Sequence, residues 1–132
     1  MLQYMLDTNI CIYVMKAYPP RLLGRFNRLA EQLCISSITL AELHYGAEKS
    51  TRRSQAIEAI EQFVAQIETI PFSAKAGSHH GQLRVELERA GSPAGTFDML
   101  IGAHARSEGL ILVTNNLREF ARMPGVRVEN WI

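Results

Sequence analysis

The sequence predicts an α/β fold, a three-layer α/β/α sandwich with a central, mostly parallel sheet. Short apolar segments alternate with segments of helical periodicity, and strands that are joined through helices pair in parallel through right-handed crossovers. Residues 110–113 are continuously aliphatic, which is typical of a strand covered on both faces. The chain has 132 residues, nearly half of them hydrophobic. We therefore expect a single domain over residues 1–132 that buries about two-thirds of the surface exposed by the unfolded chain.

The predicted strands and helices alternate along the whole chain. Apolar segments bounded by turn residues predict strands at residues 3–6, 32–36, 68–72, 110–113 and 126–131. Helical spacing of apolar residues predicts helices at residues 10–17, 21–29, 39–49, 52–67, 74–90 and 96–107, with a short helical turn at 115–120. The first helix should end before Tyr18, because Pro19 disfavours helix in the residue ahead of it, and Gly91 should end the helix 74–90.

The composition argues against several classes of protein. We find no secretory signal pattern and no apolar run near the roughly 20 residues of a membrane span, so we expect a cytoplasmic protein without a membrane partner. Cys11 and Cys34 lie in apolar segments without C-x-x-C spacing, which predicts two buried free thiols and no zinc site. The net charge of +1 is too small to indicate a nucleic-acid partner, so evidence for RNA binding must come from a site.

Polar side chains follow two predicted strands at the point where each strand ends. Asp7 comes directly after the strand 3–6, and residues 114–116 (Thr-Asn-Asn) come directly after the strand 110–113. Open α/β sheets bind ligands outside the carboxyl ends of their strands. Because an acid is costly to bury, we expect Asp7 to belong to a functional site at this edge.

Two further acids, Glu42 and Asp98, each have two interpretations. Residues 39–42 (Thr-Leu-Ala-Glu) match a capping box, in which the glutamate bonds the amide at the helix start, and Asp98 fits a first-turn aspartate favoured by the helix dipole. Alternatively, Glu42 follows the strand 32–36 on the same sheet edge as Asp7, and Asp98 caps an apolar stripe at the rim or floor of a cleft. The sequence leaves both interpretations open.

If these three acids converge, their charges require compensation. Two carboxylates about 5 Å apart repel by roughly 3 kcal/mol at an effective dielectric constant of 20. A divalent cation turns this repulsion into affinity, and ligands that are all oxygens select Mg²⁺ or Mn²⁺. Such an ion activates water for phosphodiester hydrolysis, so the protein need not supply a nucleophile.

Four segments together resemble a known family. They are residues 5–9 (MLDTN), 36–43 (SSITLAEL), 96–105 (TFDMLIGAHA) and 112–120 (LVTNNLREF). In this order and at these separations they closely resemble PIN-domain ribonucleases, specifically the VapC-type toxins of bacterial toxin–antitoxin systems. The resemblance extends from Met5 to Trp131.

The resemblance implies a Mg²⁺-dependent endoribonuclease that inhibits translation by cutting structured RNA, often a tRNA. It implies that Asp7, Glu42 and Asp98 bind the metal and are catalytic. Asn116 falls where many PIN domains carry a fourth acid; it would orient water or ligate weakly, and this departure makes a second tightly bound metal doubtful. Glu119, one turn later, either compensates or is an ordinary solvated helix residue.

The resemblance also implies partners. A small VapB-type antitoxin would neutralise the toxin, and we expect the helical hairpin 39–67 to grip it while a basic side chain of the antitoxin enters the acidic cleft. A homodimer is expected by the same analogy.

Several other polar residues have more than one interpretation. Thr8, Asn9 and Thr114 either form turns or hold the metal ligands in place. Arg84 and Arg118 are candidates for phosphate contacts that position the substrate without reading its sequence. Four histidines lack metal spacing, and among them His104 is expected near the core.

Two alternatives from other classes are open. A haloacid dehalogenase-like phosphotransferase also has an aspartate after its first strand, but it needs a second aspartate two residues later, where this chain has Asn9. A catalytically silent PIN-fold module that binds RNA or protein would keep the fold and lose the chemistry. Loss of Mg²⁺-dependent cleavage in an Asp7→Asn variant that still folds would favour the nuclease.

Overall fold

The computed structural model describes residues 1–132 and contains one five-stranded sheet in the order β3-β2-β1-β4-β5. The strands are β1 (Tyr4–Leu6), β2 (Leu33–Ser36), β3 (Glu68–Ile70), β4 (Ile111–Val113) and β5 (Val128–Glu129). All four strand pairs are parallel. The predicted α/β/α sandwich is therefore confirmed, and the sheet is entirely parallel.

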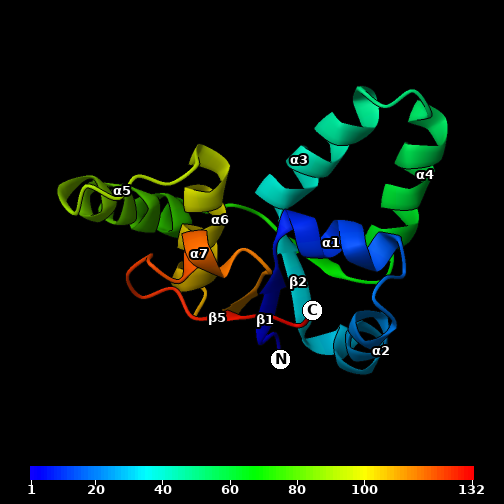
Figure 1. The fold of residues 1–132 in the computed structure, drawn as a ribbon, viewed down its shortest axis with the longest axis horizontal. Helices are drawn as coiled ribbons and strands as arrows, with labels where there is room; N and C mark the ends of the chain where they lie inside the picture. The colour runs from blue at the N-terminus through cyan, green and yellow to red at the C-terminus, as the bar shows by residue number, and fades with distance from the viewer.

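Helices cover both faces of this sheet (Figure 1). They are α1 (Thr8–Met15), α2 (Pro20–Leu29), α3 (Ser37–Glu48), α4 (Arg53–Val64), α5 (Ala74–Arg89), α6 (Thr96–Ser107) and α7 (Leu117–Phe120), with a short 3₁₀ helix at Ala30–Gln32. Helices α1 to α4 share one apolar core with Leu6 and Ile35, while α5 to α7 share the other with Met5 and Leu112. Alternate residues of β1 thus point into opposite cores, as expected for a sheet covered on both faces.

The start of α3 differs from the prediction. The helix begins at Ser37, because the hydroxyl of Ser36 accepts a hydrogen bond from the amide of Ile38 at 3.0 Å and caps it. Thr39 is buried inside the helix, so the predicted capping box does not form. Strand β2 therefore leads into α3 without a loop.

Among the predicted segments that are shorter in the structure, α4 and β5 differ most from the prediction. Helix α4 ends at Val64, and Ile67, the last member of its apolar repeat, is buried just ahead of β3. Strand β5 has only two residues of the predicted 126–131. In both cases the apolar pattern marks burial and continues past the end of the hydrogen-bonded element.

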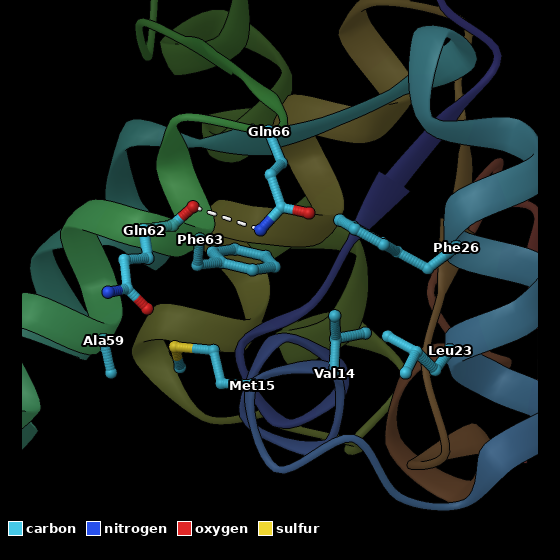
Figure 2. Close-up of a pocket in the computed structure, with 8 residues that line it drawn as sticks. All are labelled: Val14, Met15, Leu23, Phe26, Ala59, Gln62, Phe63 and Gln66. Carbon is cyan, nitrogen blue, oxygen red and sulfur yellow. Dashed lines mark hydrogen bonds between the residues drawn. The ribbon is translucent and has the colours of Figure 1, made fainter.

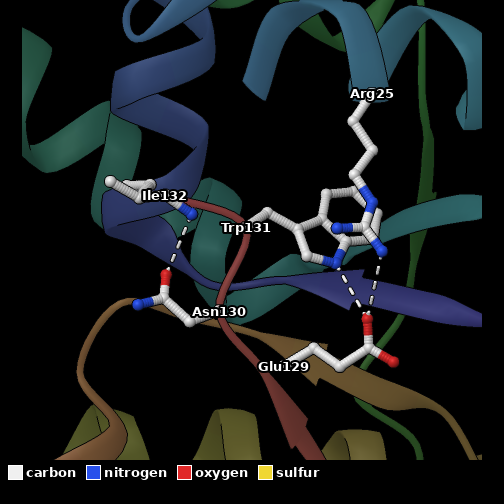
Figure 3. A network of polar contacts seen from close by, with 5 residues as sticks. All are labelled: Arg25, Glu129, Asn130, Trp131 and Ile132. Atoms are coloured by element: carbon white, nitrogen blue, oxygen red, sulfur yellow. Dashed lines mark hydrogen bonds and ion pairs between the residues drawn. The ribbon is translucent and has the colours of Figure 1, made fainter. Parts of the chain in front are cut away.

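The chain end after β5 is fixed by Trp131 (Figure 3). The guanidinium of Arg25 on α2 lies 4.4 Å from the centroid of the Trp131 ring, and the indole N–H donates to Glu129 at 2.9 Å. Tyr4 of β1 packs edge-on against the same ring at 5.0 Å between centroids. Aromatic and cation–π contacts therefore hold the chain end that follows β5 against Tyr4 of β1 and Arg25 of α2.

The two cysteines and the lengths of the helices bear on two further predictions. Cys11 and Cys34 are free and fully buried, as predicted. None of the helices is both long and apolar enough to cross a bilayer.

Candidate active site

Asp7 lies where β1 ends and α1 begins. Its Oδ1 accepts the amide N–H of Ile10 at 2.9 Å and so caps α1, and its Oδ2 accepts the hydroxyl of Thr114 at 2.5 Å. Leu6 pairs with Val113, which brings the residue after β4 beside the residue after β1. Asp7 is only 4% exposed. Burial raises the pKa of Asp7, the bonds from Thr114 and Ile10 act against this, and the charge of Glu42 adds to it.

Glu42 reaches the same edge from α3. Its Oε1 accepts the hydroxyl of Thr8, the first residue of α1, at 2.6 Å. This contact joins residues 34 positions apart, and it replaces the local capping interaction that the sequence pattern suggested. Thr8 and Thr114 therefore each hold one acid in place.

Asp98 lies in the first turn of α6 and is half-buried. Its pKa is raised to about 6, first by burial and then by the charges of Glu119, Glu42 and Asp7. The carboxylate after β1 and those on α3, α6 and α7 are thus close enough for their charges to act on Asp98. This supports the predicted convergence of Asp7, Glu42 and Asp98 at one edge of the sheet.

Glu119 is not the ordinary solvated residue that we considered. Its Oε1 accepts the amide N–H of Gly95, which caps α6, at 2.7 Å. Arg122, one turn later, donates to the hydroxyl of Ser92 and to the carbonyl of Pro93. Residues on and after α7 thereby fix the loop that precedes Asp98. The sequence carried no signal for these contacts, because they join side chains to a loop 24 to 30 residues away.

His104 supports α6 from inside the molecule. It is fully buried, as expected near the core, and its Nδ1 lies 2.7 Å from the hydroxyl of Ser36 at the end of β2. Burial lowers its pKa, so the ring is neutral. It acts as a hydrogen-bonding spacer between α6 and the sheet.

The remaining predicted site residues differ in their contacts. The amide N–H of Asn116 donates to Thr114 at 2.9 Å, while its side chain has no hydrogen bond. Asn9 is exposed and its side chain makes no hydrogen bond. Arg84 is paired with Glu88 on the exposed face of α5 and makes no bond to the acids, whereas Arg118 lines a hollow with Asn116 and Glu119.

The donor set fits a hard divalent cation. The four converging side chains offer only carboxylate oxygens. Burial raises the pKa of Asp98 most, and the repulsion by the neighbouring carboxylates, which adds to it, is the interaction that such a cation relieves. No group of three or more acidic, histidine or cysteine side chains lies close enough together to hold a metal ion as the side chains stand. The site therefore provides oxygen donors and negative charge, and the carboxylates would have to move closer together to bind the ion.

The PIN domain family matches residues 4–126, almost the whole chain. This chain is a PIN-domain protein of the VapC type. The tRNA(fMet)-specific endonuclease VapC of Salmonella typhimurium is 49% identical over 131 residues, which cover 99% of each chain. Ribonuclease VapC2 of Haemophilus influenzae is 52% identical over all of both chains. The crystal structure of DNA-bound VapBC from Salmonella typhimurium superposes with a TM-score of 0.97 at 48% identity and covers both chains completely.

Membership in the VapC family excludes one of the two alternatives left open by the sequence, the haloacid dehalogenase-like phosphotransferase, because that enzyme belongs to a different family. The catalytically silent PIN-fold module is left for experiment. The sequence predicted a ribonuclease of a VapBC toxin–antitoxin pair, and this is the function of the family to which the chain belongs.

Proposed function

We propose that this VapC protein is a Mg²⁺-dependent endoribonuclease that cuts structured RNA and so inhibits translation. The convergence of Asp7, Glu42 and Asp98 at the carboxyl edge of the sheet carries the proposal. The name of the Salmonella relative supports initiator tRNA as the substrate, since that relative is 49% identical over almost its full length.

Asp7, Glu42 and Asp98 would hold Mg²⁺, or Mn²⁺ in its place. When bound, the ion polarises a phosphoryl oxygen and lowers the pKa of a water molecule. The protein's own contribution is positioning. Thr114 and the amide of Ile10 hold both oxygens of Asp7, and Thr8 holds one oxygen of Glu42.

Two further side chains serve the same site. Glu119 holds the start of α6 through Gly95, and so it fixes the turn that carries Asp98. The unpaired amide of Asn116 replaces the fourth acid of many PIN domains, and we assign it the orientation of water or substrate beside Asp98. Asn9, which is exposed and unbonded, has no assigned contact to the acids.

We also propose that a VapB-type antitoxin binds an apolar groove on the face of α1 to α4. One part, about 530 Å³, lies between α1, α3 and α4 and is lined by apolar side chains including Met15, Leu43 and Ile60. A second part of about 140 Å³ lies between α1, α2 and α4, and Phe26 and Phe63 are among the side chains that line it (Figure 2). Met15 and Ala59 line both parts, so the groove is continuous.

The groove reaches the acids directly, because Glu42 lines its larger part. An amphipathic segment of the antitoxin that lies in the groove can therefore place a basic side chain against Glu42. This arrangement would block the catalytic edge and agrees with the expected role of the hairpin now defined by α3 and α4. The homodimer stays a prediction from the family, and size-exclusion chromatography with light scattering tests it.

Mapping of RNA 5′ ends in cells that express the chain without an antitoxin tests the proposed function. New 5′ ends should accumulate at one position in initiator tRNA with the wild type and be absent with the isosteric Asp98→Asn variant. Growth arrest with identical 5′-end profiles in both strains would favour the silent binding module.

A further inference from the structure

A polar hollow borders the acids on the side of α7. Its volume is about 340 Å³, and it is lined by Asn116, Arg118, Glu119 and Arg122, without any hydrophobic residue. The hollow shares a wall with the acid cluster. A Cβ atom built on Gly95 would lie 3.4 Å from Oδ2 of Asp98 and 3.6 Å from Oε1 of Glu119, so both carboxylates surround the same glycine.

The two arginines of the hollow differ in how they are held. Arg122 is fixed, because its guanidinium donates to the hydroxyl of Ser92 and to the carbonyl of Pro93, the latter at 2.7 Å. Arg118 is exposed and has neither a hydrogen bond nor an ion pair. The guanidinium of Arg122 is therefore held in a fixed position and supplies positive charge, whereas all the N–H donors of Arg118 are free.

The other two residues complete a donor-rich lining. Glu119 is occupied by the amide of Gly95, which leaves its charge partly satisfied. The backbone of Asn116 is fixed by Thr114, while its side-chain amide is unbonded and can donate. Two guanidiniums and one carboxylate give the hollow a net positive charge directly beside a negative cluster.

We propose that this hollow binds a backbone phosphate of the RNA next to the phosphate that is cut. Arg118 donates to it, Asn116 adds a neutral donor and Arg122 supplies fixed positive charge. A guanidinium suits this task because its planar donors match two phosphate oxygens. The contact positions the strand over the acids without reading a base. The inference rests on the proposed ribonuclease function and names how its substrate is held.

The test measures binding of initiator tRNA to the Asp7→Asn protein, in which cleavage is abolished and the hollow is intact. Against this background, Arg118→Ala should weaken binding about tenfold and lower the slope of log K against log salt concentration by about 1. Arg118→Lys should restore part of the slope, because it keeps the charge. Arg28→Ala is the matched control, since Arg28 is an exposed, unpaired arginine of α2 on the other face of the sheet.

A second measurement detects RNA binding at the hollow under conditions in which no cleavage takes place. Titration of the wild-type protein with a short single-stranded RNA, without divalent metal, should shift the Nε–H NMR signals of Arg118 and Arg122 and leave that of Arg28 in place. Equal effects of Arg118→Ala and Arg28→Ala on tRNA binding would overturn the inference, even if the wild type cuts tRNA. If the wild type fails to cut tRNA while the Arg118 signal still shifts, the proposed function fails and the phosphate site stands. An Arg118 signal that does not move with RNA also contradicts the site.

Discussion

At the scale of single residues, Asp98 shows how burial and neighbouring carboxylates together disfavour a negative charge. Its pKa of about 6, against a usual value of 3.8, means that the folded protein binds a proton there more tightly than the unfolded chain. Between these two values the folded state carries more protons. The free energy of unfolding therefore falls as the pH rises from about 4 through 6, in the absence of metal.

The Asp98→Asn variant should remove this dependence. In EDTA we expect it to be more stable than the wild type by about 1 kcal/mol near pH 8, a figure reduced for solvent screening because Asp98 is half exposed. The difference should vanish below about pH 4, where the wild-type carboxyl is protonated in both states. Urea unfolding at a series of pH values measures it. A difference that is constant over the whole range would mean that neither burial nor the neighbouring charges raise the pKa of Asp98 in the folded protein.

Thr114 is the residue whose hydroxyl we expect to matter most for Asp7. It donates to Asp7 and accepts the amide of Asn116, and it is fully buried. Thr114→Val leaves both partners without their bond and should lower the free energy of unfolding by about 2 kcal/mol. The acidic limb of the pH–rate profile should also move to higher pH, since a bond that lowers the pKa of Asp7 is lost.

Thr114→Ser is the control for this change, because it keeps the hydroxyl and removes only a methyl group. It should retain most of the stability and an unshifted pH–rate profile. If the serine and valine variants behave alike, packing and not the hydroxyl explains the effect.

Single residues also show what the sequence can and cannot predict about a site. Asp7 was predictable because a strand end fixes its place and parallel pairing brings Thr114 beside it. Glu42 was ambiguous because a local capping pattern competed with a tertiary contact to Thr8. The contacts of Glu119 and Arg122 were not predictable, because they are made with the loop before α6, which comes near these side chains only in the folded chain.

At the scale of elements, the close packing of α6 against the segment after α7 places Asp98. Gly102 faces this segment, and a Cβ atom there would lie 2.7 Å from Sδ of Met123 and 3.7 Å from Phe120. Both neighbours are buried, so they have little room to move. The glycine allows α6 to approach the structure that carries Glu119 and Arg122.

Gly102→Val should therefore lower the free energy of unfolding by about 2 to 3 kcal/mol through overpacking. Gly81→Val on α5 is the matched control, because no atom lies within 4 Å of its Cβ position and glycine and valine differ little in helix propensity. Chemical denaturation of both variants tests the difference. Equal stabilities would show that α6 and the 120–126 segment are not tightly packed.

The sequence predicted most elements because apolar periodicity reports burial, and burial accompanies most helices and strands here. The predicted ends of helices and strands were wrong where buried residues lie outside the hydrogen-bonded element. Ile67 is buried outside α4, and Val126 and Trp131 are buried outside the two residues of β5. The start of α3 moved because Ser36 serves both the strand and the helix cap.

At the scale of the whole molecule, the apolar groove and the acidic edge form one connected surface. Ala59 lies in both parts of the groove and is exposed on α4. A charge placed there would have to be buried by any apolar segment that docks, at a large cost in desolvation. RNA cleavage should be unaffected, because Ala59 is not among the residues of the acid cluster.

Ala59→Glu should therefore weaken binding of the cognate VapB-type antitoxin at least about tenfold, measured by isothermal titration calorimetry. Ala90→Glu, an exposed alanine at the end of α5, introduces the same charge away from the groove and should bind like the wild type. Equal affinities for the two variants would place the antitoxin elsewhere on the protein.

The most direct test of the central claim is cleavage of 5′-labelled initiator tRNA by the purified protein. With Mg²⁺ the wild type should give one discrete product. The product should disappear in EDTA and in the Asp7→Asn variant, provided that circular dichroism shows the variant folded. Cleavage that persists in EDTA and in Asp7→Asn would contradict the assignment of the converging carboxylates as the metal-binding catalytic site.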